Sequence, residues 1–393
     1  MASQSLRAHA STLLVGNLLS QAFAFFSFLI VARTAGPGGF GHYIVFYSLS
    51  MVAGDVLDFG VSRRLLRDGR EPESRFVLMQ VLRARLMILV VASAAATYVG
   101  GNLHLIVLAL AVGLGRAVSL ATQYWLQSRA YLFRSVMVSL TERVVSLAVL
   151  LAATSDGGPW SEAAWALWAG TTSAAVTAAI VAFVVPVPEK ARDLVRMSLL
   201  RALLWGRAFA LGVVAVNLML LDSAIVSAIS GAASAAYFGV GSRMVSPLLL
   251  PISAMALGLM AVHSLARSDH SLIRVVIMTA SLILCGLGLT TGFWVPLIFG
   301  ASFEPAIVPA AFYCFATIFS VLGSPLIAGL QRQGHQALVG RLLLAGVLAC
   351  LLMLAAGAVV GAAQGAAAGY FVGQVATFAL IGSAYRRRMR YQQ

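Results

Sequence analysis

Six of the charged residues inside long apolar stretches of the sequence, where charged side chains are rare, are candidates for a functional site. They are Arg116, Arg143, Arg243, Asp55, Asp58 and Asp222. An ionisable group in the middle of a membrane costs about 2.5–3.5 kcal/mol, so such groups usually face an aqueous path. Guanidinium groups there would bind an anion such as phosphate in a bidentate manner, and carboxylates would hold a proton or a cation.

Each of the three arginines also has a structural interpretation. Arg143 follows Glu142 and could simply form a local ion pair with it. Arg116 could reach a membrane interface or make a structural contact between helices. Arg243 lies two turns inside an apolar segment and is the best candidate of the three for lining an aqueous path.

The aspartates leave several roles open. Asp55 and Asp58 are three residues apart, on one face of a helix, and could bind a cation. The simpler interpretation is that Asp58 pairs with Arg63 or Arg64 just after the apolar segment. Asp222 has no obvious partner nearby in the sequence, so it could be the counter-ion of an arginine, a proton carrier or part of a cation site.

Two amides, Gln21 and Asn217, are further candidates for binding the hydroxyl groups of a polar ligand. Amides within a membrane more commonly join neighbouring helices, at about 0.6 kcal/mol each. The six histidines and three cysteines are scattered without metal-ligand spacing, and there is no nucleotide-binding loop or nucleophile motif. We therefore expect no metal, no cofactor and no enzymatic activity.

The elements that carry these residues are apolar helices. Hydrophobic residues make up 60% of the chain and charged residues only 10%, which predicts an all-α membrane protein. About twelve transmembrane helices are expected. Their approximate ranges are 12–32, 42–60, 82–100, 105–123, 136–154, 163–187, 203–227, 234–258, 272–295, 306–328, 338–360 and 365–385.

Basic residues alternate between the connections in a way that predicts the orientation. All but four of the 27 lysines and arginines fall in the terminal segments and in every second connection, and Arg33 alone falls in the other connections. Positive charge is retained on the cytoplasmic side, so both termini are predicted to be cytoplasmic. The same distribution explains the net charge of +14 without nucleic acid as a partner.

The longest connection divides the chain into two predicted six-helix bundles, residues 1–190 and 191–393. A weak internal repeat supports this division. Gly36 ends the first expected helix and Gly231 ends the seventh, and Tyr43 and Phe238 follow them at the same spacing. Two related bundles are a known plan for transporters.

Several short motifs resemble those of polysaccharide flippases, which belong to the multidrug/oligosaccharidyl-lipid/polysaccharide exporter superfamily. Residues 14–43 look like the first helix and turn of that family, and residues 58–63 (Asp-Phe-Gly-Val-Ser-Arg) resemble the end of its second helix. Leu221-Asp222, the segment 237–243 with the two following prolines, and residues 299–303 resemble later parts. The resemblance covers most of the chain, with trimmed loops.

The resemblance implies transport of an undecaprenyl-pyrophosphate-linked sugar or oligosaccharide from the inner to the outer leaflet of the bacterial cytoplasmic membrane. Two bundles would alternate around a hydrated cavity lined by arginines. The expected partners are the polyprenyl-pyrophosphate-linked glycan and membrane lipid, together with glycosyltransferases and a polysaccharide polymerase. The alternatives are a cation-coupled multidrug exporter, a membrane glycosyltransferase, or a scaffold of a glycan assembly complex.

Overall fold

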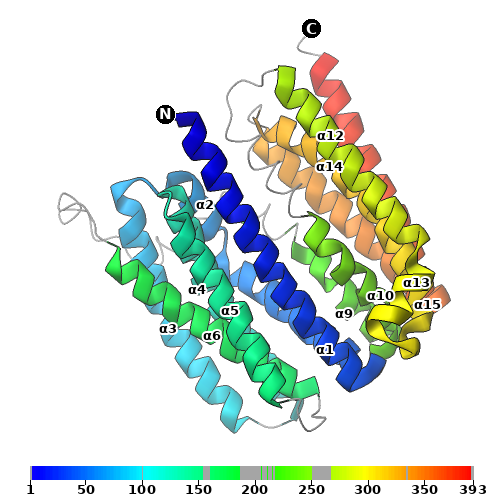
Figure 1. Cartoon of the computed structure of the whole chain (residues 1–393), viewed down its shortest axis with the longest axis horizontal. Helices are drawn as coiled ribbons and strands as arrows, with labels where there is room; N and C mark the ends of the chain where they lie inside the picture. Colours follow the sequence, from blue (N-terminus) through cyan, green and yellow to red (C-terminus); the bar gives the residue numbers. More distant parts are fainter. Residues whose placement is uncertain are drawn as a thin grey trace. The chain divides into compact units, whose positions relative to one another are not determined.

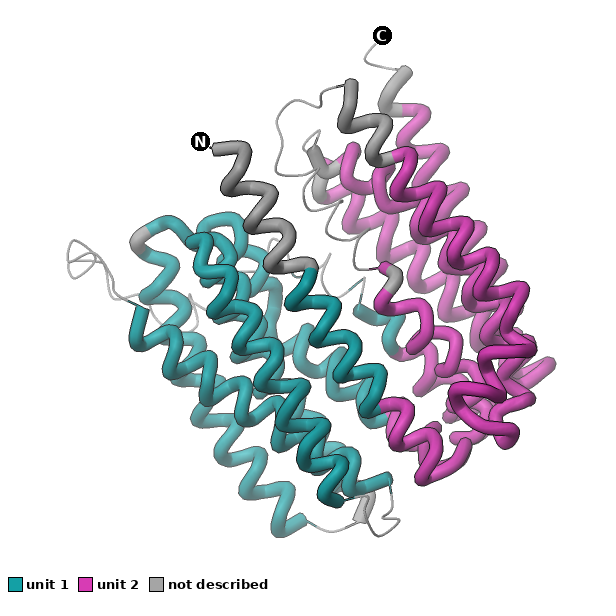
Figure 2. The backbone as a smooth tube through the Cα atoms, in the orientation of Figure 1, with its two compact units in different colours: residues 1–27, 46–220 teal, residues 28–45, 221–393 magenta. Residues whose placement is uncertain are grey.

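A computed structural model describes most of the chain as helices (Figure 1). It describes residues 2–99, 101–153, 160–185, 205, 210, 215, 217–249, 267–332 and 335–390. The backbone contacts divide the chain into two compact units (Figure 2). Unit 1 comprises residues 1–27 and 46–220, and unit 2 comprises residues 28–45 and 221–393.

Among the described residues, seven helices are long and apolar enough to cross a membrane, or eight if one bent pair counts as a single span. Their exposed side chains are largely apolar, as Val91 and Leu352 illustrate at 69% and 70% exposure. Such surfaces fit lipid rather than water, so the chain is a multi-pass membrane protein. The number twelve stays a prediction, because the expected spans 203–227 and 234–258 lie partly outside the described residues.

Among the described residues, unit 1 contains the first and last parts of α1 and five further helices, and their bounds differ from the predicted spans. After the second part of α1 come α2 (Val61–Asp68), α3 (Pro72–Tyr98), α4 (Gly101–Ser128), α5 (Leu132–Ala153) and α6 (Trp160–Val184). Helix α4 packs against α2, α3, α5 and α6, so it is the central helix of the unit. A core of Leu, Val and Ala side chains with the fully buried Trp125 surrounds it.

Unit 2 contains the middle of α1 and the helices that follow Leu221. They are α9 (Asp222–Ser230), α10 (Ala232–Val245), α12 (Arg267–Leu289), α13 (Thr291–Phe299), α14 (Ile307–Arg332) and α15 (Gln336–Arg390). Short 3₁₀ turns precede α9, follow α10 and connect α13 to α14. Helix α14 packs against α10, α12 and α15, with a small core around Leu284 and Cys314.

The chain makes a turn at two glycines where the sequence predicted the end of a helix. Helix α1 (Ala2–Asp58) breaks at Gly36, which has φ 64° and ψ −174°. Gly231, between α9 and α10, has nearly the same geometry, with φ 87° and ψ 165°. This is backbone that glycine adopts far more readily than other residues, so the two glycines of the predicted repeat make the same kind of turn.

Two spans differ from the sequence expectation in their continuity. The expected span 272–295 bends by 75° between Leu289 and Thr291, which makes two helices, α12 and α13. Helix α15 runs through both of the last expected spans and breaks between them at Gly361 and Ala362. The bend between α12 and α13 was not predicted, because a turn within an apolar stretch has the same hydropathy as a straight helix.

The unit boundaries divide the first two spans. Residues 28–45, on both sides of the break at Gly36, make their contacts with the later helices, so they belong to unit 2. In that unit a carbon atom added at Gly41 would lie 1.8 Å from the carbonyl oxygen of Ala232, which shows how closely the two turns pack. The division into residues 1–190 and 191–393 stays a prediction about the repeat.

Close packing of glycines within α15 leads to a stability prediction. A Cβ added at Gly357 would lie 2.0 Å from the carbonyl oxygen of Gly365, so the two arms of α15 touch backbone to backbone. We expect Gly357→Ala to destabilise the protein by about 1–3 kcal/mol, the usual cost of overpacking. Thermal unfolding in detergent measures this. Gly382→Ala, in the same helix with no atom within 4 Å of an added Cβ, is the control and should change little.

Candidate functional site

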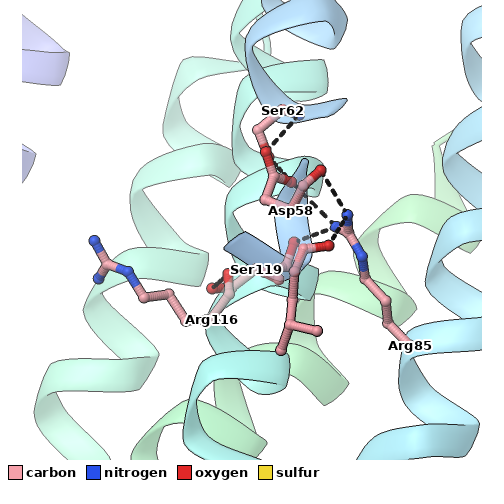
Figure 3. A network of polar contacts seen from close by, with 7 residues as sticks. Asp58, Ser62, Arg85, Arg116 and Ser119 are labelled. Atoms are coloured by element: carbon pink, nitrogen blue, oxygen red, sulfur yellow. Dashed lines mark hydrogen bonds and ion pairs between the residues drawn. The ribbon is translucent and has the colours of Figure 1, made fainter. Parts of the chain in front are cut away.

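A buried ion pair joins α1 to α3 within unit 1 (Figure 3). The Nη1 of Arg85 lies 3.2 Å from Oδ1 of Asp58, and both side chains are 3% exposed. Arg85 also donates to three backbone carbonyls: Nη1 to Ala117 at 2.9 Å, and Nη2 to Leu57 and Asp58 at 3.0 Å each. The guanidinium is therefore occupied by partners from α1 and α4.

The turn that follows α1 explains why Asp58 stands there. Phe59 and Gly60 both have positive φ, 48° and 75°, and this turns the chain sharply into α2. Asp58 then accepts hydrogen bonds from the backbone N–H of Ser62 at 3.1 Å and from its hydroxyl at 2.7 Å. The carboxylate acts as the cap of α2 as well as the partner of Arg85.

The expected pairing of Asp58 with Arg63 or Arg64 is wrong. Arg63 lies over the ring of Tyr124, 5.5 Å from its centre. Arg64 pairs with Asp68 at 3.2 Å and stacks on Trp205. Helix α3 begins ten residues before the expected span. Arg85 therefore lies well inside the helix rather than at its end, and this position brings it to Asp58.

Arg116 is one of the arginines of unit 1 that form no ion pair with a carboxylate in the described part of the chain. It lies near the middle of α4, a helix of 28 residues, and is half-buried. Its Nε is buried and makes no hydrogen bond. In Figure 3 its guanidinium points away from the Asp58–Arg85 pair.

Asp55 is the carboxylate that acts electrostatically on Arg116. It is 6% exposed, and its Oδ2 makes no hydrogen bond. Arg116, Asp58 and Arg63 are the charges near it. Helices α1 and α4 approach closely here, because a Cβ at Gly54 would lie 2.9 Å from the carbonyl oxygen of Gly113. The two candidate residues therefore share one region of unit 1, without an ion pair between them.

Arg143 forms the ion pair with Glu142 that their adjacency in the sequence suggested. Its Nη2 lies 3.3 Å from Oε1 of Glu142, and the side chains are 13% and 5% exposed. Glu142 faces α6, where a Cβ at Gly170 would lie 2.4 Å from the carbonyl oxygen of Glu142. A role of Arg143 in ligand binding stays a prediction.

Arg243 is the intramembrane cation of unit 2. It lies in the last turn of α10, later in its helix than expected, and is half-buried. Its guanidinium carbon stands 4.5 Å from the centre of the Phe28 ring, a cation–π contact with a residue of α1. This contact orients the side chain toward Phe28.

Asp222 opens α9 near Arg243 and is 7% exposed. Its Oδ1 accepts hydrogen bonds from the backbone N–H and the hydroxyl of Ser223. Asp222 interacts electrostatically with Arg243 and with two tyrosines, Tyr313 and Tyr370. Of the roles left open by the sequence, counter-ion of Arg243 agrees with this placement, and a proton or cation role stays a prediction.

The tyrosine pair was missed by the sequence analysis. The rings of Tyr313 and Tyr370 are stacked with centres 4.7 Å apart, and their hydroxyls are 3.5 Å apart. Phe238 packs edge-on against both. A tyrosine in each of two apolar spans was the available signal, but nothing in the sequence indicated that the two would meet.

The amides have less specific positions. Gln21 lies in α1 and is half-buried, and Asn217 is also half-buried and has a contacting partner. Among the described residues, no group of three His, Cys, Asp or Glu could hold a metal ion. In unit 1 the structure brings Asp55 near Arg116 and pairs Asp58 with Arg85. In unit 2 it groups Asp222 with Arg243 and the tyrosines.

Comparisons with known proteins give a consistent fold. An inward-facing multidrug resistance MATE family transporter of the MOP superfamily is similar over 95% of both chains, with a TM-score of 0.71 and 15% identity. The lipid II flippase MurJ in an inward closed conformation is similar over 95% of this chain and 87% of MurJ, with a TM-score of 0.65 and 10% identity.

A third similar structure is a MOP superfamily transporter from Pyrococcus furiosus, described with the words "reverse polarity of binding pocket suggests different function". The similarity covers 98% of this chain and 95% of that structure, with a TM-score of 0.62 and 14% identity. No family model matches the sequence, and no curated protein matches it. Sequence identities this low establish the fold alone. The chain is a multi-pass membrane protein with the fold of MOP superfamily transporters.

Proposed function

We propose that the protein is a transporter that flips an undecaprenyl-pyrophosphate-linked sugar or oligosaccharide from the inner to the outer leaflet of the bacterial cytoplasmic membrane. The observation that carries this proposal is a half-buried arginine within an apolar helix of each unit, Arg116 in α4 and Arg243 in α10. Burying each charge costs about 2.5–3.5 kcal/mol, so a function that needs the charge is the simplest reason to keep it.

The chemistry of a pyrophosphate suits these residues. It carries about two negative charges and several oxygens that accept hydrogen bonds, and a guanidinium binds two such oxygens at once. Arg143 and the amides Gln21 and Asn217 would assist, the amides by hydrogen bonding to sugar hydroxyls. The isoprenoid chain would stay in lipid, so only the headgroup needs a polar path.

Energy for the outward step is available without ATP. Moving two negative charges outward across 100 mV, inside negative, releases about 4–5 kcal/mol. Asp222 and Asp55 are the candidates for coupling transport to a proton or cation, and Asp222 would also balance the charge of Arg243 while no substrate is bound. Asp58 has a different role in this proposal, because its carboxylate is committed to Arg85 and Ser62.

A cation-coupled multidrug exporter is the second candidate, and two observations favour it. Similar structures include MATE family transporters, and the buried Asp55 and Asp222 could take a cationic substrate. Against it, the half-buried charges in the spans include Arg116 and Arg243, which would repel a cation. For the Pyrococcus furiosus transporter, too, a binding pocket of reverse polarity is described as suggesting a different function.

Reconstitution distinguishes the two candidates. Purified protein in liposomes would be given a fluorescent undecaprenyl-pyrophosphate sugar on one side, and separately a cationic dye with a pH or sodium gradient. We expect movement of the lipid-linked sugar between leaflets and no gradient-dependent dye transport. Dye transport without sugar flipping would replace this proposal with the multidrug exporter. If neither compound moves, the protein is better explained as a scaffold or a glycosyltransferase. An assay of sugar transfer would distinguish these two.

A further inference from the structure

Two arginines lie at the end of unit 1 that carries α2. Arg129 and Ser74, the neighbour of Arg75, both donate hydrogen bonds to the carbonyl oxygen of Gly69. Arg129 directly follows α4, and Arg75 lies in the first turn of α3. The Nε of Arg129 donates to the carbonyl oxygen of Gly69 at 2.8 Å, and its guanidinium lies 4.9 Å from the centre of the Trp125 ring. These neutral partners fix the position of the charge without balancing it.

The two guanidinium groups repel each other. Burial, and then the nearby charge of Arg75, lower the pKa of Arg129 below its usual value. Within the described part of the chain, neither arginine forms an ion pair with a carboxylate, whereas Arg64 and Arg67 at the same end both pair with Asp68. A partly buried pair of like charges, held in place by carbonyls, is the arrangement that an anion would stabilise.

The surroundings of the pair indicate what kind of anion fits. Nη2 of Arg75 lies 3.5 Å from the carbonyl oxygen of Phe183, at the end of the membrane-spanning helix α6. Phe183 and Val184 are 56% and 67% exposed, so an apolar surface continues from the arginines along the helix. An anion with an attached hydrocarbon chain satisfies both features. An acidic protein segment or free phosphate would use only the charges.

We propose that Arg75 and Arg129 bind the phosphate of an anionic membrane phospholipid, with its acyl chain along Phe183 and Val184. A phosphodiester such as that of phosphatidylglycerol accepts hydrogen bonds from both guanidinium groups. This site is separate from the arginines of the proposed transport path, because Arg116 lies near the middle of α4 and Arg129 follows its end. The bound lipid would join the ends of α3, α4 and α6.

Lipid exchange on the purified full chain tests this proposal. The protein in detergent is mixed with phosphatidylglycerol and phosphatidylcholine of the same chain length, and the bound lipids are counted by native mass spectrometry. Arg75→Gln is the main variant, since Arg75 makes only a long contact with Phe183 and its loss should leave the fold intact. Arg274→Gln, which removes an exposed arginine from unit 2, is the control of equal charge.

We expect wild type to prefer phosphatidylglycerol, and Arg75→Gln to lower its affinity for that lipid about tenfold, the loss of one charge-assisted hydrogen bond. Arg274→Gln should keep the preference, and Arg75→Glu should lose it completely. If Arg75→Gln and Arg274→Gln lose the same affinity for phosphatidylglycerol, the total charge of the protein determines lipid binding, and the proposal is overturned. If equimolar inorganic phosphate displaces the lipid, the ligand of the site is free phosphate and not a phospholipid, which would also overturn the proposal. Neither result depends on whether the protein flips a sugar carrier.

Discussion

Replacing Arg243 with glutamine is expected to reduce flipping of a lipid-linked sugar by about 100-fold in proteoliposomes. The physical reason is the loss of charge-assisted hydrogen bonds to the pyrophosphate, worth about 3 kcal/mol in total. Glutamine is unbranched and polar like arginine but shorter and neutral, so the cation–π contact with Phe28 is lost, while the half-buried position should keep helix packing intact. Initial rates of flipping, normalised to the amount of protein inserted, measure the effect.

A matched set of variants makes this prediction specific to charge at that position. Arg243→Lys keeps the charge but loses the planar bidentate geometry, so we expect an intermediate rate. Arg274→Gln removes an exposed arginine of the same unit and should flip at the rate of wild type. Normal flipping by Arg243→Gln would exclude the role proposed for Arg243.

Breaking the buried pair of unit 1 is expected to have the largest effect on stability. In Arg85→Leu, the carboxylate of Asp58 stays buried with only Ser62 as a partner, and three carbonyls lose their donor. Removing one partner of such a pair costs about 3–5 kcal/mol. Thermal and denaturant unfolding of the purified protein in detergent measure the loss.

The exposed pair of Arg67 and Asp68 is the natural comparison. Arg67 is 57% exposed, so Arg67→Gln should cost only about 0–1 kcal/mol. The double variant Asp58→Asn/Arg85→Leu should be less destabilised than the sum of its two single variants, because no charge remains buried. Additive losses would show that Asp58 and Arg85 do not act as a pair.

The sequence was sufficient to predict most helices and turns, because apolar length and glycine position determine them locally. Gly36 and Gly231 were identified as equivalent ends of helices from spacing alone, and both have positive φ. The bend near Thr290 was not predictable, since the residues on both sides are equally apolar. The start of α3 at Pro72 was also missed, because charged residues near the membrane surface hide the true end of a helix.

The sequence singled out candidate residues one by one, but it missed Arg85 and the two tyrosines, and it did not predict the pairings. Glu142 and Arg143 are neighbours in the sequence, so their ion pair could be anticipated. Asp58 and Arg85 are 27 residues apart, and Tyr313 and Tyr370 are 57 apart. Contacts of this kind depend on how helices are rotated and offset against each other, which composition and periodicity do not specify. Arg116 and Arg243 were found because a charge in an apolar span stands out by itself.

The central claim is that guanidinium groups within the spans bind the phosphorylated end of an isoprenoid carrier. The most direct measurement is the affinity of the purified protein for a polyprenyl pyrophosphate compared with the uncharged polyprenyl alcohol of the same length. We predict that the pyrophosphate binds at least about tenfold more tightly, and that the difference disappears in Arg116→Gln/Arg243→Gln. Equal affinities for the two compounds, or a preference that survives in the double variant, would contradict the claim.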